Sequence, residues 1–286
     1  MKPLGVVGAP THSSFPPPTS LFLPKRLQSH HFCVPRASSG SRTAEHAKTA
    51  ATIPEYKPSV FDNLFLQLFR NKLVAGGGGR NEKEIHHSTP FQEVGWDSNK
   101  PGYDGLIEVA NQLMMKGRTR IDTIEAAVRV LRSLFPPFLL ELYKMLIAPI
   151  GGGKVAAMMV ARVTALTCQW LMGPCKINSV DLDNGGSCSS GVYVERCKYL
   201  EESKCASICV NTCKFPTQTF FLDHMGVPLL MEPNFSDYSC QFKFGVLPPL
   251  PEDDSILKEP CLEACPHAAK RRVVARDRDE APCPKI

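Results

Sequence analysis

The sequence lacks the spacings that identify several common binding sites. No two of its 12 cysteines are separated by only two residues, so it has no CxxC pair of the kind that usually holds structural zinc. The glycine-rich stretches at 75–90 and 151–154 have no Lys-Ser or Lys-Thr at the phosphate-binding spacing, so neither is a P-loop. No internal repeat is present either.

Acidic residues are nearly missing from the first fifty positions. That segment has six basic residues and one acid, Glu45, for a net charge of +5. The rest of the chain holds 33 − 6 = 27 basic and 28 − 1 = 27 acidic residues, and is therefore neutral. Nucleic-acid binding needs clustered cations on the folded part of a protein. The charge distribution therefore predicts no nucleic-acid partner.

Segment 1–50 also lacks the unbroken apolar run of roughly 7–15 residues that a secretory signal needs. It is rich in Ser, Thr, Pro and Ala, and such a composition buries too little apolar surface to fold alone. We interpret it as a disordered plastid transit peptide, which places the protein in the chloroplast. A tail with no targeting role is the alternative. In a plastid, clustered cysteines indicate metal or redox chemistry rather than disulfides.

Apolar periodicity predicts several helices in the region 51–173. Segment 154–173 approaches the roughly 20 residues of a membrane span, but Arg162 lies near its middle. We expect a buried helix there, or one that lines an apolar pocket. Ser59 and Asp122 are the expected caps of two other helices, and the prolines at 136 and 137 are expected in a first turn. The predicted helices cover 59–73, 102–117, 121–135, 136–149 and 154–173.

The pattern changes after Pro174 to short strands and short helices. The sequence predicts an α+β fold, in which a helical N-terminal half packs on a small, mostly antiparallel sheet with two short helices. We expect a helical region at 51–173, a cysteine-rich α+β region at 174–268 and a flexible tail at 269–286. The predicted strands are 176–182, 191–197, 227–232 and 238–246, and the two helices are 202–213 and 216–226.

Cys205, Cys209 and Cys213 follow one another at intervals of four residues. Residues i and i+4 share a helix face about 6 Å apart along the axis, which allows two thiolates to hold one metal or cluster. On an unbroken helix the third thiol lies about 12 Å from the first. We therefore expect the helix to break before Cys213, at Asn211 or under the influence of Pro216.

Iron–sulfur clusters usually take four thiolates, so further ligands are needed. Redox or disulfide use, and plain packing of a small apolar side chain, are the alternatives to metal binding. The candidates for further ligands are Cys197, Cys240, Cys261 and Cys265.

The stretches RCKYLEESKCASICVNTCKFPTQTFF, MGVPLLMEPNFSDYSCQFKFG and LMGPC together resemble the plant β-carotene isomerase family that begins strigolactone synthesis. The resemblance runs from about Tyr56 to Cys265. It implies reversible isomerisation of all-trans-β-carotene to the 9-cis form, a plastid location, and iron, alone or in an iron–sulfur cluster. A paralogue that prefers another isomer is the alternative within the family.

Isomerisation of a conjugated double bond requires a transient loss of bond order. Electron transfer, protonation and reversible thiolate addition are three routes to it. Iron held by Cys205, Cys209 and Cys213 suits the first route. His224, or Asp223 beside it, suits the second, although a histidine at a helix end is often only a partner of the helix dipole. Cys205, near a helix N-terminus, suits the third.

A carotenoid substrate is a long hydrocarbon that lives in membranes, so its site needs an apolar groove. The helix 154–173 and the preceding stretch FLLELYKMLIAPI (138–150) are the candidates for lining that groove, or for peripheral contact with a plastid membrane, and plain core is the alternative. Two other functions compete with the isomerase: a plastid iron–sulfur electron-transfer or cluster-carrier protein, and a non-catalytic carotenoid-binding protein. The candidate substrate contacts are Met158, Met159, Trp170 and Met172.

Overall fold

The computed structural model describes residues 59–75, 95–116, 119–182, 186–265 and 268. All of these residues lie in one unit of the chain, Pro35–Ile286. The predicted transit peptide, the predicted tail, Cys33 and Cys283 lie outside the described residues.

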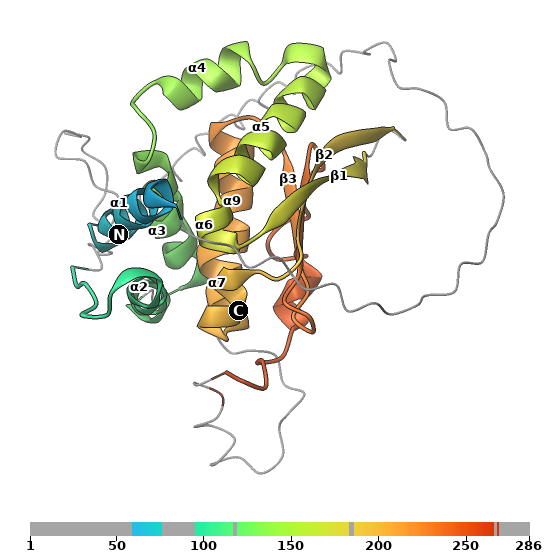
Figure 1. The fold of residues 1–286 in the computed structure, drawn as a ribbon. Helices are drawn as coiled ribbons and strands as arrows, with labels where there is room; N and C mark the ends of the chain where they lie inside the picture. The colour runs from blue at the N-terminus through green and yellow to red at the C-terminus, as the bar shows by residue number, and fades with distance from the viewer. Residues whose placement is uncertain (1–58, 76–94, 117–118, 183–185, 266–267, 269–286) are drawn as a thin grey trace, which may run out of the picture. The chain divides into compact units, whose positions relative to one another are not determined.

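An antiparallel sheet is the centre of the C-terminal half, as the sequence predicts. Its strand order is β1-β2-β4-β3, and each neighbouring pair runs antiparallel. The second strand begins four residues earlier than predicted, because the polar residues from Ser187 onward pair with β1. The strands are β1 (Cys175–Asp181), β2 (Ser187–Val194), β3 (Leu229–Pro233) and β4 (Cys240–Phe244) (Figure 1).

The two faces of this sheet differ in polarity. In β4, Phe242 and Phe244 are buried and alternate with the half-buried Gln241 and Lys243. On the polar face, the Asn178 amide of β1 donates to Oε1 of Gln241 at 2.7 Å. Alternation of this kind is typical of an antiparallel sheet that packs its apolar face on a core and leaves the other face to solvent.

Three amphipathic helices precede the sheet, and all three were predicted. They are α1 (Val60–Val74), α2 (Gly102–Lys116) and α3 (Arg120–Ser133). Ser59 caps α1 in a capping box with Asp62, as expected. The cap of α3 is Thr119, not Asp122. Asp122 instead closes the box, because its carboxylate accepts from the Thr119 N–H at 2.9 Å while Thr119 Oγ1 accepts from the Asp122 N–H at 3.1 Å.

The next helices are shorter than predicted. The prolines at 136 and 137 lie before α4 (Leu139–Leu146) rather than in its first turn, because Phe138 takes a left-handed backbone (φ 67°) between them and the helix. After the 3₁₀ turn η1 (Ile150–Gly153) come α5 (Lys154–Thr167) and α6 (Gln169–Met172), which are separated by a non-helical Cys168.

Helix α5 packs across β2 of the sheet (Figure 1). Its sheet-facing side includes Ala156, Ala157, Ala161 and Ala165, which are buried, so the helix is half buried rather than fully buried as expected. The main hydrophobic core takes residues from both the helical region and the cysteine-rich region. Among the described helices, no single one is both long and apolar enough to cross a membrane.

The helical run from 206 to 224 does not break before Cys213, so that prediction is wrong. Its segments alternate between α and π geometry, and Phe215 keeps helical dihedral angles. The Phe215 N–H donates to the Val210 carbonyl, five residues back. A π-turn tolerates Pro216, because the wider turn relaxes the ring's clash with the preceding turn that breaks an α-helix.

The remaining elements complete the cysteine-rich region. The helix α7 precedes the long run, and a 3₁₀ turn follows the sheet. These elements are α7 (Lys198–Ser203), α8 (Ala206–Cys209), η2 (Val210–Lys214), α9 (Phe215–Thr219), η3 (Phe220–His224) and η4 (Ser255–Lys258).

Candidate functional site

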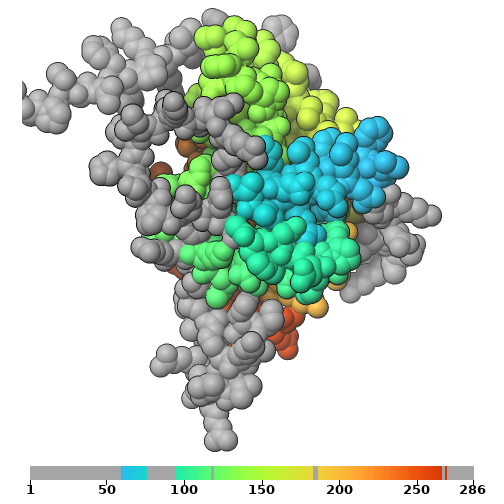
Figure 2. Space-filling view, turned by 90° about the vertical axis from the view of Figure 1, so that its left-hand side faces the viewer, coloured from blue at the N-terminus to red at the C-terminus, as the bar shows by residue number. Residues whose placement is uncertain are grey.

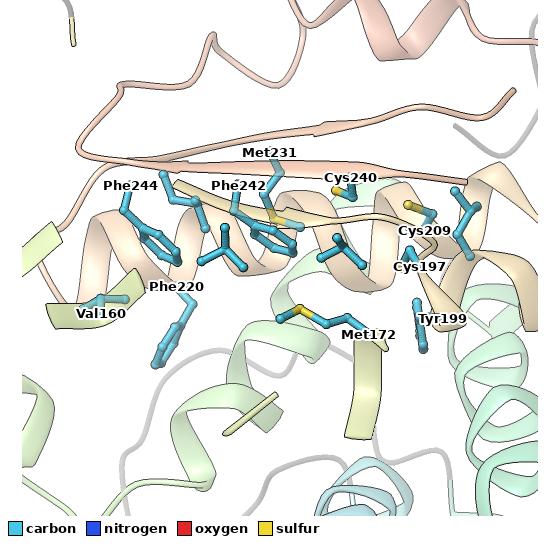
Figure 3. Packing of buried hydrophobic residues seen from close by; sticks show 14 of the residues in the cluster. Val160, Met172, Cys197, Tyr199, Cys209, Phe220, Met231, Cys240, Phe242 and Phe244 are labelled. Atoms are coloured by element: carbon cyan, nitrogen blue, oxygen red, sulfur yellow. The ribbon is translucent and has the colours of Figure 1, made fainter. Parts of the chain in front are cut away.

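Four cysteines from separate parts of the chain meet in the core. We call Cys197, Cys209, Cys213 and Cys240 the thiol cluster. Burial raises the pKa of both Cys209 and Cys240, and the neighbouring Cys197 and Cys213 add to both shifts, so all four groups lie within electrostatic range of one another. Figure 3 shows Cys209 and Cys240 side by side, with Cys197 beneath Cys209. Tertiary structure therefore gathers thiols that are up to 43 residues apart in sequence.

The sheet and the helical run place these thiols. Cys240 is the first residue of β4, and it pairs in register with Val194, the last residue of β2. The chain then leaves β2, and the Cys197 N–H donates to the Tyr238 carbonyl at 2.7 Å. That bond holds the residues that follow β2 beside the residues that precede β4. Cys209 ends α8 and Cys213 lies in the π-turn η2, so both come from the helical run 206–224.

The other three predicted ligands lie in the same core as the thiol cluster. Cys205 is the N-cap of α8, and its carbonyl accepts from the Cys209 N–H at 3.2 Å. Cys205 and Cys265 are buried in the main core, and Cys261 packs against it half-buried. All seven predicted thiols therefore lie in one hydrophobic core. Cys205, however, precedes the helix and does not share a helix face with Cys209 and Cys213.

Burial keeps the thiols of the cluster protonated. It raises the pKa of Cys209 and Cys240 well above their usual value, and that of Cys213 to about 12. Burial also raises the pKa of Cys197, against the opposing effect of the Leu200 and Tyr199 N–H groups. Near neutral pH these groups are thiols and weak donors, not thiolate nucleophiles. The thiolate-addition route therefore gains no support from these four residues.

The cluster has the right donors for iron but not the arrangement of a metal site. Four thiols are the usual ligand set of an iron–sulfur cluster. The ten cysteines at described positions are thiols, not disulfides. Across the described ranges, however, no group of three or more His, Cys, Asp or Glu side chains converges as a metal ion requires. Iron binding by Cys205, Cys209 and Cys213 stays a prediction.

Two tyrosines that the sequence reasoning missed border the cluster. The Tyr199 hydroxyl lies 2.8 Å from Thr212 Oγ1, and burial raises its pKa while the thiols of Cys213 and Cys209 add to the shift. The Tyr103 hydroxyl donates to the Leu171 carbonyl at 2.5 Å, and its pKa is raised by burial and then by Cys197. The sequence feature that could have pointed to Tyr199 is its position two residues after Cys197, a predicted ligand.

The predicted proton donors lie away from the thiol cluster. His224 ends η3, eleven residues beyond Cys213, which is about 16 Å at the rise of an α-helix. Burial lowers its pKa, and the charge of Arg132 lowers it further. Its ring lies 6.2 Å from the Phe220 ring. The structure therefore does not bring His224 or Asp223 to the thiols.

The four predicted substrate contacts do not line one surface. Met172 is buried in the main core, which also contains Tyr199 and the thiol cluster (Figure 3). Trp170 packs edge-on against Phe69 of α1, at 5.7 Å between ring centroids, in a second core. Met159 is exposed on α5, and Met158 is half-buried beside it. Of the four, Met172 is the one that lies in the same core as the thiols.

The segment that contains the thiol cluster is similar to a known protein family. Residues 170–253 match the family model described as "Beta-carotene isomerase D27-like, C-terminal". For this similarity, we call residues 170–253 the D27-like domain. The D27-like domain contains the whole sheet and all four residues of the thiol cluster. Cys261, Cys265, α4 and α5 lie outside it.

Two curated relatives extend the similarity beyond the D27-like domain. The chain is 36% identical over 171 residues to "Beta-carotene isomerase D27, chloroplastic" of Arabidopsis thaliana, across 59% of this chain and 62% of that protein. It is 34% identical over 178 residues to the protein of the same name from Medicago truncatula, across 60% and 66%. The chain therefore spans slightly less than two thirds of these relatives. No solved structure matches.

Proposed function

We propose that the protein is a plastid carotenoid cis/trans isomerase. The observation that carries this proposal is the D27-like domain, which contains the thiol cluster in an apolar core. Two relatives about 35% identical are named chloroplastic beta-carotene isomerases, which supports the enzyme class, the carotenoid substrate and the plastid location.

Within this class, we propose the reversible conversion of all-trans-β-carotene to 9-cis-β-carotene as the reaction. The product would serve strigolactone synthesis. The support for both is the resemblance of the cysteine-rich stretches to the family that begins this synthesis. A hydrocarbon substrate offers no groups for hydrogen bonding, so recognition depends on apolar shape. Met172, with Phe220 and Phe242 along the same core, is the lining that we propose (Figure 3).

We propose iron as the cofactor, on the chemistry of the donors. Thiolates in one cluster suit iron in either a mononuclear or an iron–sulfur centre. The support is this chemistry alone, since the side chains of the described residues do not converge as a metal ion requires. Iron and acid-labile sulfide, measured on protein purified without oxygen, test it directly. Protein that isomerises β-carotene at full rate with no bound iron excludes the cofactor but leaves the isomerase proposal intact.

The experiment that tests the function is pigment analysis of bacteria that accumulate all-trans-β-carotene and express the full chain. We expect the 9-cis fraction to rise above that of cells with an empty vector. An unchanged isomer ratio with carotenoid bound to the purified protein indicates a carrier. An unchanged ratio with a brown, iron-containing protein and no pigment indicates the electron-transfer or cluster-carrier alternative. Either of the last two results rejects the isomerase.

A further inference from the structure

The outer face of α5 carries its bulkiest apolar residues. The face packed on the sheet consists mainly of alanine, which allows a close approach of helix to strand. The opposite face has Val155, Met159, Val163 and Leu166, and the last of these is 79% exposed. Their spacing of four, four and three residues forms one stripe along the helix. A helix that faces water normally has the opposite arrangement, with its large apolar residues inside.

The apolar surface continues over α4. The run 150–167, which includes α5, is bent by 106° from α4, and only Leu140 of α4 is buried. In Figure 2, the side chains of α4 and the adjoining part of α5 (bright green to yellow-green) gather together. We call the exposed apolar residues of both helices the α4–α5 surface. It consists of Phe138, Leu139, Leu142, Met145, Leu146, Ile150, Val155, Met159, Val163 and Leu166.

Neither helix is long enough to span a bilayer. The eight residues of α4 extend about 12 Å and the fourteen of α5 about 21 Å. A hydrocarbon core is about 30 Å thick. A bent pair with one apolar side is instead suited to lie in the interface, with that side sunk among the lipid chains.

The charges beside this surface favour an anionic partner. Lys144, Lys154 and Arg162 outnumber Glu141 in the segment 138–167, which gives it a net charge of 3 − 1 = +2. Long basic side chains rest their stems on apolar surface and keep the charge at headgroup level. Anionic lipids attract such residues.

We propose that the α4–α5 surface docks the protein on a lipid bilayer that contains anionic lipids. A protein partner fits the surface less well, because interface centres are enriched in aromatic residues and Phe138 is the only aromatic among its ten residues. Helix α5 leads directly through Cys168 to α6 and Met172. A protein docked in this way would hold the segment that leads to the core of the thiol cluster next to the membrane in which carotenoids reside. The docking itself does not depend on the isomerase proposal.

The test is flotation of the purified full chain with vesicles that hold no carotenoid. We expect binding to vesicles of phosphatidylcholine with phosphatidylglycerol, and at least tenfold weaker partitioning of the double variant Met145→Glu/Leu166→Glu. The matched control is Leu247→Glu/Leu250→Glu, since those leucines are 60% and 61% exposed elsewhere on the chain. The control should bind like the unchanged protein. Circular dichroism checks that both variants fold.

A second pair of variants tests the charges. Lys154→Gln/Arg162→Gln should lower binding to the anionic vesicles severalfold and leave the weaker binding to pure phosphatidylcholine unchanged. The proposal is overturned if the unchanged protein does not float with vesicles, or if the Met145→Glu/Leu166→Glu variant binds as well as the control. It is also overturned if that variant only converts a dimer to a monomer in sedimentation. Because the assay contains no substrate, absent isomerase activity does not affect its outcome.

Discussion

The ammonium group of Lys214 contacts the carboxylate of Asp254 in a buried ion pair, with the two side chains 4% and 6% exposed. The pair joins the π-turn η2 to the N-cap of η4. The same cation lowers the pKa of Cys209 and Cys240, against the stronger effect of burial. One contact thus fixes the start of η4 against the helical run that carries two of the four thiols.

Removing the cation of this pair should destabilise the protein strongly. We expect Lys214→Met to lower the free energy of unfolding by about 3–5 kcal/mol, because a buried carboxylate then has no counter-charge. Lys214→Met/Asp254→Leu should recover most of the loss, apart from about 1 kcal/mol for the cap that Asp254 provides to the Ile256 N–H. Urea denaturation measures both values.

The control for the ion pair is Lys176→Gln. Its pair with Glu195 is exposed to solvent, so its loss should change the unfolding midpoint far less. Equal losses from Lys214→Met and Lys176→Gln would contradict the account of the buried pair.

Replacing one thiol of the cluster should affect function, whereas replacing a buried thiol elsewhere should not. If iron is bound as proposed, Cys209→Ser should lower both bound iron and the rate of 9-cis-β-carotene formation by at least about 10-fold, because losing even a group that only supports a metal ligand costs about 10–100-fold. Cys188→Ser is the matched control, because Cys188 is also buried but lies on β2 where that strand pairs with Val180, outside the cluster. Equal activities of the two variants would show that the thiol of Cys209 is not needed for the reaction.

Labelling with iodoacetamide should show that the cluster is protonated in the native protein. The reagent reacts with the thiolate, and a raised pKa lowers the thiolate fraction at any pH below it. With the pKa of Cys213 at about 12, only about one molecule in ten thousand is ionised there at pH 8. We expect slow native labelling of Cys213 that accelerates as the pH rises toward 12, and rapid labelling at pH 8 in guanidinium.

Peptide mass spectrometry resolves this labelling at each cysteine. The unfolded chain serves as the reference for each peptide's intrinsic reactivity. Native labelling of Cys213 at pH 8 as fast as in the unfolded chain would show that the thiol is neither buried nor raised in pKa.

Gly191 allows β1 and β4 to approach β2 closely on the polar face of the sheet. A Cβ at this position would lie 2.1 Å from Asn178 Oδ1 and 2.6 Å from Val180 Cγ1. We expect Gly191→Ala to cost about 1–3 kcal/mol of unfolding free energy, as overpacking of a filled site does. If the site had room for the methyl group, Gly191→Ala would instead raise the unfolding free energy, because alanine lowers the conformational entropy of the unfolded chain. The direction of the shift in the thermal unfolding midpoint therefore distinguishes a filled site from an open one. Ser187→Ala, exposed on the same strand, is the control.

Local sequence patterns were sufficient for much of the fold. The apolar period of α1, α2 and α3 and the alternation in β4 depend on neighbouring residues alone, and these elements lie within a few residues of their predicted bounds. The predicted helix bounds were wrong where one residue is compatible with two different structures. Pro216 starts a helix or breaks one, and the π-turn that accommodates it has no simple sequence signal.

The sequence by itself determined which residue types are present: a run of thiols at helical spacing and a long apolar segment at 154–173. Only the tertiary structure decided how they are used. The register of Val194 with Cys240 brings distant cysteines together, and strand register is set by long-range pairing rather than by local sequence. Likewise, a helix that is apolar on all sides has no polar face to show which side will be buried. Packing against the sheet chose the alanine side of α5 and left Met159 and Leu166 outside.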